Sequence, residues 1–330
     1  DTAEFERKVR PDDAACSERQ ASRPEVDRDT IYALASASGR SGVAVVRLSG
    51  QQADQALLAL QGGSKRSLPA ARLAALRRLH HPHSGSLLDH ALVVRFPAPA
   101  SFTGEDVVEL HLHGSPAVVR ALLGAMAELP GLRMARAGEF ARRAFLAGKM
   151  DLCQLESTAD LLAAETEAQR EQAVAMMDGG PSSIYNRWRK ELLGCLSSVE
   201  AVLDFGEDAD LSDSIAVDVR RRASALRQGI QQQLNDGRRG ELVRDGVRAV
   251  LLGPPNAGKS SILNLLAGRP AAIVASQPGT TRDIVEVPLD LGGLKVIMSD
   301  TAGMREGGCE VEEEGIRRAV EAARMADVLL

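Results

Sequence analysis

One stretch decides the fold of the C-terminal part of the chain: Gly253-Pro254-Pro255-Asn256-Ala257-Gly258-Lys259-Ser260. It matches the phosphate-binding pattern G-x-x-x-x-G-K-[ST] at every required position. An apolar run, 247–252, precedes it, and a helix-like sequence, 261–266, follows it. The glycines let successive backbone N–H groups point at a phosphate, and the lysine adds a charge for the outer phosphates. The stretch therefore predicts a nucleotide-binding site between a buried strand and a helix.

Length and composition indicate a globular protein with more than one domain. The 330 residues exceed one ordinary hydrophobic core, so two or three domains are expected. The net charge of −5 gives no overall basic field, so any RNA contact has to be local or come from a partner. The four cysteines include no C-x-x-C pair, which favours a reducing compartment over a zinc or disulfide framework. No apolar run approaches membrane-spanning length.

The sequence pattern divides the chain into four segments and predicts a multidomain α/β protein. Residues 1–28 mix charges of both signs and are predicted to be a disordered leader. Residues 29–148 combine strand-like and helix-like runs without strict alternation, which predicts an α+β domain. Residues 149–245 carry apolar residues at helical spacing, which predicts the first half of a helical bundle. Residues 246–330 return to α/β character, as in a phosphate-loop domain that ends before it is complete.

Two details of the helical segment are also predicted. Apolar residues at helical spacing run from Leu155 to Met176, with Thr166 on the same face, and indicate one continuous helix. The acidic stretch 204–213 follows no metal-ligand spacing, so it is expected to be a solvated connection between helices.

A second motif follows a predicted hairpin around Gly292-Gly293: Asp300-Thr301-Ala302-Gly303. We expect Asp300 to hold magnesium through water and the Gly303 N–H to contact the γ-phosphate. Between the two motifs, Thr281 can close onto magnesium when the third phosphate is present, so the expected magnesium set is Ser260, Thr281 and Asp300. Position 304 is Met, which cannot orient an attacking water, so water positioning and charge compensation must come from elsewhere.

These motifs resemble the MnmE/TrmE family of tRNA-modification GTPases. The C-terminal resemblance rests on 253–261, on Pro-Gly-Thr-Thr-Arg-Asp at 278–283 and on Asp-Thr-Ala-Gly-Met-Arg-Glu at 300–306. Three upstream motifs agree with it independently: 39–50, Ser-Phe-Thr-Gly-Glu-Asp at 101–106, and Ala-Gly-Glu-Phe-Ala-Arg-Arg-Ala-Phe-Leu-Ala-Gly-Lys at 137–149. The resemblance runs from about Asp29 to Leu330.

The resemblance implies a folate-binding N-terminal domain that also forms a homodimer. By motif match, Arg47, Glu109 and Lys149 would contact 5-formyltetrahydrofolate or a related tetrahydrofolate. Without the resemblance these residues would be interpreted as an ordinary salt-bridged set. It also implies GTP hydrolysis and action with an MnmG-type FAD protein on carbon five of the wobble uridine of certain tRNAs.

In the family, potassium replaces an arginine finger, and dimerisation of the GTPase domains switches on hydrolysis. By match, potassium would be held by Asn256, Ala275, Gln277 and Thr280. A cation there would offset charge that develops in the transition state. Glu312 would orient water beside Thr281 and Gly303. The implied GTP contacts are Asn256, Ala257, Gly258, Lys259, Ser260, Ser261, Thr280, Thr281, Asp300, Thr301, Ala302 and Gly303.

Two other interpretations share parts of this pattern. A non-enzymatic switch, such as a ribosome-assembly GTPase, has the phosphate loop but gives no reason for a folate-type domain. A folate-binding dimerisation module with an impaired nucleotide site is the other.

The sequence ends before the family's Asn-Lys-x-Asp element, which reads guanine. The leader and the Gly-Pro-Pro of the loop resemble organelle members, which favours the mitochondrion, with a bacterial cytoplasm as the alternative.

Overall fold

The structure is a computed structural model of the chain. It describes residues 29–62, 67–205, 209–236, 238–253, 257–267, 285–300, 321 and 323–330, and for 205, 209–213, 236, 260, 267, 285 and 300 it describes the backbone alone. The chain divides after Met150 into two compact units, which are described separately. The leader expected at 1–28 lies outside the described residues.

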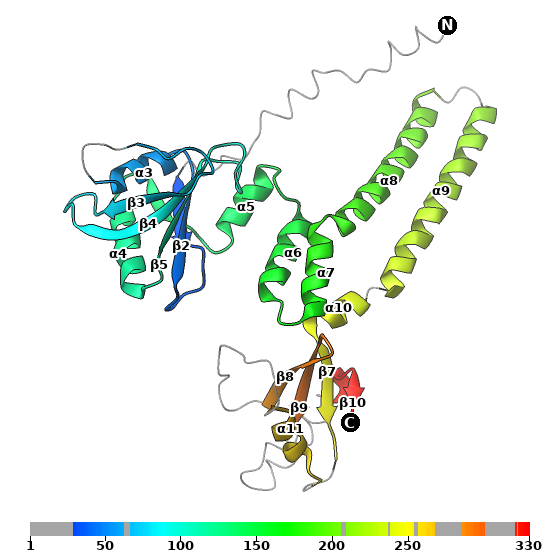
Figure 1. Cartoon of the computed structure of the whole chain (residues 1–330). Coiled ribbons are helices and arrows are strands. Elements are labelled where there is room, and N and C mark those ends of the chain that lie inside the picture. Colours follow the sequence, from blue (N-terminus) through cyan, green and yellow to red (C-terminus); the bar gives the residue numbers. More distant parts are fainter. Residues whose placement is uncertain are drawn as a thin grey trace. The chain divides into compact units, whose positions relative to one another are not determined.

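The described residues of the first unit form a mixed sheet and three helices (Figure 1). Its elements are β1 (Thr30–Leu34), β2 (Val43–Ser49), α3 (Ala53–Leu60), β3 (Ala75–His80), β4 (Leu87–Phe96), β5 (Val107–His113), α4 (Pro116–Ala127), β6 (Leu132–Met134) and α5 (Glu139–Leu146). The strand order is β3-β4-β5-β2-β1-β6, and neighbours are antiparallel except β1 and β6, which are parallel. This arrangement makes β5 and β2 the centre of the sheet.

The core lies on one face of this sheet, where α3 and α4 cover it. Side chains alternate along a strand, so every second residue of β5 points into the core. Val108, Leu110 and Leu112 are buried in this way, while Glu109 and His111 lie on the opposite face. Leu57 and Leu60 of α3 and Leu122 and Met126 of α4 complete the apolar layer. The opposite face carries polar side chains together with exposed apolar ones such as Leu92.

The second unit joins a helical part to a small mixed sheet (Figure 1). Its elements are α6 (Leu152–Ala163), α7 (Glu167–Met177), α8 (Gly180–Phe205), α9 (Ala209–Asp236), α10 (Arg238–Asp245), β7 (Val247–Leu251), α11 (Lys259–Ala267), β8 (Val285–Leu291), β9 (Leu294–Asp300) and β10 (Val328–Leu329). The strand order is β10-β7-β9-β8, with β7 parallel to β9 and β10 and β8 antiparallel to β9. The described elements confirm the expected multidomain α/β class.

The helical part differs from the prediction in two places. The helix expected from Leu155 to Met176 is broken at 164–166, because the Gln169 side-chain oxygen accepts the backbone N–H groups of Glu165 and Thr166 at 2.9 and 3.1 Å and so starts a new helix. The acidic stretch 204–213 is not a connection throughout, since α8 extends to Phe205 and α9 begins at Ala209. Residues 210–213 therefore belong to α9.

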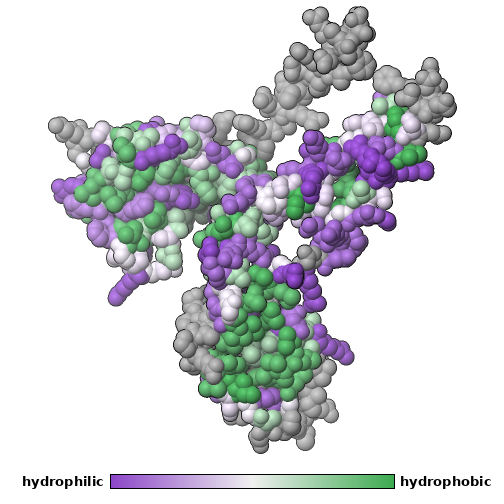
Figure 2. All heavy atoms as spheres, turned by 45° about the vertical axis from the view of Figure 1, so that its right-hand side comes forward, coloured by the Kyte–Doolittle hydropathy of each residue, from purple (hydrophilic) through white to green (hydrophobic). Residues whose placement is uncertain are grey.

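Apolar side chains remain exposed over the second unit, where Figure 2 shows a continuous hydrophobic area on the small sheet and its helix. Exposed apolar side chains on the elements of this sheet and on α11 are Ile262, Leu265, Leu291, Leu294, Val328 and Leu329. Large exposed apolar areas generally mark surfaces that pack against another segment or partner. Among the described residues, no helix combines the length and the apolar character that crossing a membrane requires.

Replacing Leu110 by Ala should test the position of the core. Leu110 is 0% exposed, so its truncation should lower the free energy of opening of β2 and β5 by about 3 kcal/mol. Leu92 on β4 is 47% exposed, and Leu92→Ala should cost less than about 1 kcal/mol. Amide hydrogen exchange in peptides from β2 and β5 measures both. An equal decrease of the opening free energy in the two variants would show that the core does not lie on the face that carries Leu110.

Candidate functional site

The phosphate loop lies between β7 and α11, as the sequence predicts. Of its residues, the structure describes Gly253 and Ala257 onward. Gly258 has φ +89°, a conformation that glycine adopts without a steric penalty. Lys259 is 8% exposed, and its Nζ donates to the backbone oxygen of Gly253 at 2.7 Å. The lysine is thus folded back across the loop, where a bound phosphate would offer oxygens to the same ammonium.

The second nucleotide motif starts beside this loop. In the parallel pair β7–β9, Leu251 is in register with Asp300, so the two strands end together at one edge of the sheet. The phosphate loop leaves that edge after β7, and Asp300 ends β9 there. Gly253, which follows β7, and Asp300, which ends β9, therefore lie at one edge of the sheet, the kind of edge where ligands bind in open α/β sheets.

The remaining nucleotide residues are placed only in part. Ala257, Gly258, Lys259 and Ser261 are described, and Ser260 and Asp300 are described by their backbone. The others lie outside the described residues: Asn256, Ala275, Gln277, Thr280, Thr281, Thr301, Ala302, Gly303 and Glu312. Their proposed contacts with GTP, magnesium, potassium and water stay predictions.

The structure brings two of the three predicted folate residues into direct contact. Arg47 on β2 pairs across the sheet with Glu109 on β5, and its Nε and Nη2 lie 2.9 and 2.8 Å from Glu109 Oε1. The Arg47 guanidinium also lies 5.0 Å from the ring centre of Phe102 and 5.8 Å from that of Phe140. Two phenyl faces and a carboxylate therefore hold this guanidinium in place on the open face of the sheet.

Lys149, the third predicted residue, borders the loop that carries Phe102. A Cβ added at Gly104 would lie 3.6 Å from Lys149 Cγ, so the lysine stem runs along the 101–106 loop. Its backbone N–H donates to Ala144 at the end of α5. Cations, a carboxylate and aromatic faces around one loop fit a heteroaromatic ligand with N–H donors and a negatively charged tail.

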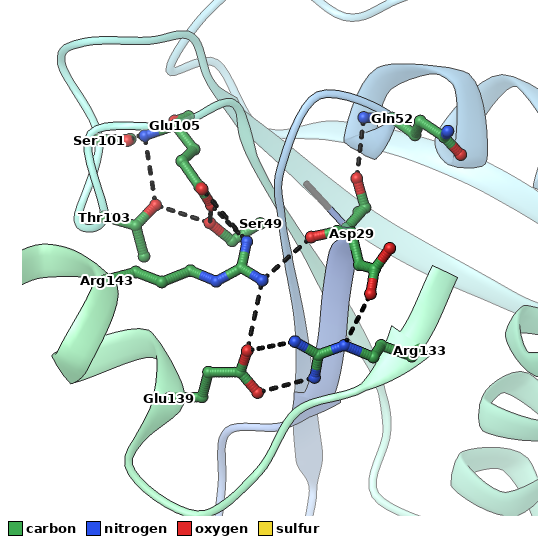
Figure 3. Close-up of polar contacts among 10 residues, drawn as sticks. Asp29, Ser49, Gln52, Ser101, Thr103, Glu105, Arg133, Glu139 and Arg143 are labelled. Carbon is green, nitrogen blue, oxygen red and sulfur yellow. Dashed lines mark hydrogen bonds and ion pairs between the residues drawn. The ribbon is translucent and has the colours of Figure 1, made fainter. Parts of the chain in front are cut away.

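A charge network behind this loop was not predicted from the sequence (Figure 3). Its centre is Arg143 of α5, which is 4% exposed. Arg143 Nη1 lies 3.1 Å from both carboxylate oxygens of Glu105, and Nη2 donates to Glu139 at 3.3 Å and to the backbone oxygen of Asp29 at 3.0 Å. Arg133 donates to both oxygens of Glu139 at 2.9 and 2.6 Å. The network joins the 101–106 loop, α5 and the residue before β1.

Hydrogen bonds also fix the loop from its other side. The Ser49 hydroxyl donates to Glu105 Oε2 at 2.6 Å and lies 2.6 Å from the Thr103 hydroxyl. The loop that presents Phe102 to Arg47 is thus held by side chains from β2 and α5. The available sequence signal was the set of opposite charges within the motifs 101–106 and 137–149.

Three side chains of the first unit converge elsewhere, at the β3–β4 turn. His83 Nδ1 lies 2.9 Å from Glu128 Oε2, and His81 Nε2 lies 3.5 Å from Glu128 Oε1. However, His81 Nδ1 accepts the backbone N–H groups of His83 and Ser84, so its neutral ring carries the proton on Nε2. That nitrogen then has no lone pair for a metal, and the group serves to tie the turn to the end of α4.

Replacing Glu139 by Gln should test the charge network through its pH dependence. Hydrogen bonds from Arg133 lower the Glu139 pKa from 4.5 to about 2. Because the folded-state pKa is depressed, this stabilisation is present above about pH 4.5 and is lost as the pH falls toward 2. Glu139→Gln should lower the free energy of unfolding near neutral pH by up to about 3 kcal/mol. On acidification the variant should then lose less of its free energy of unfolding than the unsubstituted protein does.

The measurement is scanning calorimetry between pH 3 and pH 7. Glu128→Gln removes a half-exposed carboxylate from the same unit and serves as the control, with an expected effect of less than about 1 kcal/mol. If the stability of Glu139→Gln fell with decreasing pH as steeply as that of the unsubstituted protein, the network would not contribute to stability.

Comparison with sequence models of protein families shows the family of this chain. The sequence model described as "GTP-binding protein TrmE N-terminus" matches residues 30–149, and the model described as "MnmE helical domain" matches residues 152–324. The chain belongs to the MnmE/TrmE family. The resemblance inferred from the six motifs is thereby confirmed, and the two matches meet close to the boundary between the two units.

Named members of the MnmE/TrmE family match over most of the chain. A Danio rerio protein named "5-taurinomethyluridine-[tRNA] synthase subunit GTPB3, mitochondrial" is 53% identical over 302 residues, which cover 92% of this chain and 60% of that protein. The Homo sapiens protein of the same name is 49% identical over 316 residues, 96% of this chain and 64% of the relative. "tRNA modification GTPase MnmE" of Parvibaculum lavamentivorans is 52% identical over 303 residues, 91% and 68% respectively. The chain therefore spans about three fifths of the length of the vertebrate relatives.

Proposed function

We propose that this protein is a GTP-hydrolysing enzyme of tRNA modification that acts on carbon five of the wobble uridine. One observation carries the nucleotide part of the proposal: the phosphate loop and Asp300 meet at the edge where β7 and β9 end. The tRNA part is supported by membership of the MnmE/TrmE family and by the names of its relatives, "tRNA modification GTPase MnmE" and "5-taurinomethyluridine-[tRNA] synthase subunit GTPB3, mitochondrial".

The proposed roles of the nucleotide-site residues combine their chemistry with what the family resemblance implies for potassium and for Glu312. Backbone N–H groups of Ala257 to Ser261 bind the phosphates, and the Lys259 ammonium exchanges the Gly253 oxygen for phosphate oxygens. Ser260, Thr281 and Asp300 would hold magnesium, which neutralises charge on the phosphates. Asn256, Ala275, Gln277 and Thr280 would hold potassium, which supplies the charge of an arginine finger. Glu312 would orient the attacking water, with Thr281 and the Gly303 N–H at the γ-phosphate.

The folate site is the second part of the proposal. Arg47, Glu109 and Lys149 would hold 5-formyltetrahydrofolate or a related tetrahydrofolate, which carries a one-carbon group when bound. Glu109 accepts N–H groups of a heteroaromatic ring, Lys149 attracts a carboxylate, and the rings of Phe102 and Phe140 exclude water from Arg47. The proposed folate-binding and dimerisation domain comprises 29–148, and the helical and GTPase domains comprise 149–245 and 246–330.

The proposed partners follow from the same assignment. They are tRNA, a second copy of the chain and an MnmG-type FAD protein. The vertebrate relatives carry the word mitochondrial in their names, and the bacterial relatives are equally similar. We propose the mitochondrion as the location, with a bacterial cytoplasm as the alternative.

Potassium dependence tests the proposed hydrolysis. GTP hydrolysis by the whole protein should be faster in potassium than in sodium at equal ionic strength, because the cation compensates charge that develops between the phosphates. Asn256→Ala should bind GTP as the unsubstituted protein does and should lose the stimulation. Asn264→Ala, an exposed asparagine of α11, should keep it. Equal rates in sodium and potassium would contradict the potassium mechanism, and no GTP binding would contradict the nucleotide site.

A further inference from the structure

His111 shares the open face of the sheet with the two paired folate residues. It follows Glu109 by two positions on β5, so the two side chains lie on the same face. Its neighbours in register are Val45 on β2 and Leu92 on β4. The side chain is 33% exposed, so a ligand on this face reaches the ring.

The His111 ring has an unmet hydrogen-bonding group. Its Nε2 is buried and has no hydrogen-bond partner among the described residues. The nearest acidic group is Glu109, whose Oε2 lies 3.7 Å away. That distance exceeds the range of an N–H···O hydrogen bond and leaves no room for a bridging water. Buried polar atoms normally have hydrogen-bond partners. A buried nitrogen without one beside a candidate ligand site therefore indicates a hydrogen bond that forms when a ligand is bound.

Glu109 is correspondingly held on one side only. Arg47 donates two N–H groups to Oε1. Oε2, the oxygen nearer His111, is 3.7 Å from Nε2, and among the described residues it accepts no hydrogen bond. A carboxylate that must receive ligand N–H groups in a fixed direction needs both of its oxygens oriented.

We propose that His111 is a positioning residue that fixes the Glu109 carboxylate when a ligand binds. Nε2–H donates to Oε2 in the bound state, so that Arg47 and His111 hold the carboxylate from both sides while it accepts N–H groups of the ligand. The inference rests on the proposed folate site and adds His111 to the residues that would orient the ligand there.

This role predicts opposite behaviour of affinity and stability. In the free protein Nε2 makes no hydrogen bond, so His111→Leu loses none and should not lower the unfolding temperature. In the complex the same change removes a charge-assisted hydrogen bond and should weaken ligand binding about tenfold. His111→Gln keeps a side-chain N–H donor and should bind within about threefold of the unsubstituted protein.

The test is calorimetric titration of the whole chain with 5-formyltetrahydrofolate, combined with thermal unfolding of each variant. His90→Leu is the control, because His90 is an exposed histidine of β4 two positions from Leu92, the register partner of His111. The expected result is weaker binding in His111→Leu alone, at an unchanged or higher unfolding temperature.

Two results would overturn the inference while leaving the folate site intact. One is His111→Leu binding as tightly as the unsubstituted chain. The other is equal loss of affinity in His111→Leu and His111→Gln together with lower unfolding temperatures, which would show a purely structural role. No binding by the unsubstituted chain would refute the folate site itself, and the inference with it.

Discussion

The buried guanidinium of Arg143 is the constraint on which the first unit depends. A charge in the interior is tolerated only when carboxylates and carbonyl oxygens surround it, and removing one partner of a buried pair costs about 3–5 kcal/mol. Its partners come from Glu105, Glu139 and the backbone of Asp29, which are 38, 4 and 114 residues away. Satisfying this one charge therefore fixes the 101–106 loop against α5 and the start of β1. The loop in turn presents Phe102 to Arg47, so the candidate ligand face inherits its geometry from the network behind it.

The second unit depends on the parallel pairing of β7 and β9. That pairing places the phosphate loop and Asp300 at the same edge. The turn between β8 and β9 lies at the other end of β9 and contacts the helical part. There the Ala168 N–H donates to Gly293 O at 3.2 Å, and Lys295 Nζ lies 2.6 Å from Glu165 Oε2. The strand that ends at the nucleotide edge is thus anchored at its beginning to α7, within the same compact unit.

Local signals in the sequence were enough for much of the fold. Apolar spacing predicts the phosphate-loop helix, and Gly292-Gly293 predicts the hairpin, because both depend on neighbours in the chain. The break at 164–166 depends on one Gln169 side chain that replaces two backbone hydrogen bonds, and periodicity does not register it. The ion pair of Arg47 with Glu109, which are 62 residues apart, is what the residues suggest without the resemblance, whereas the resemblance predicts that both contact a folate. The Arg143 network and the orphaned His111 nitrogen are products of long-range packing and could not be predicted.

The central claim is that the phosphate loop and the proposed folate site serve one reaction on tRNA. The direct measurement is mass spectrometry of wobble-uridine modification in tRNA from cells whose natural full-length protein carries Lys259→Ala, Arg47→Ala or, as a control, Lys190→Ala on the exposed side of α8. The account predicts that both site variants lose the modification and that the control keeps it. Full modification in Arg47→Ala beside its loss in Lys259→Ala would contradict it, because the two sites would then act independently.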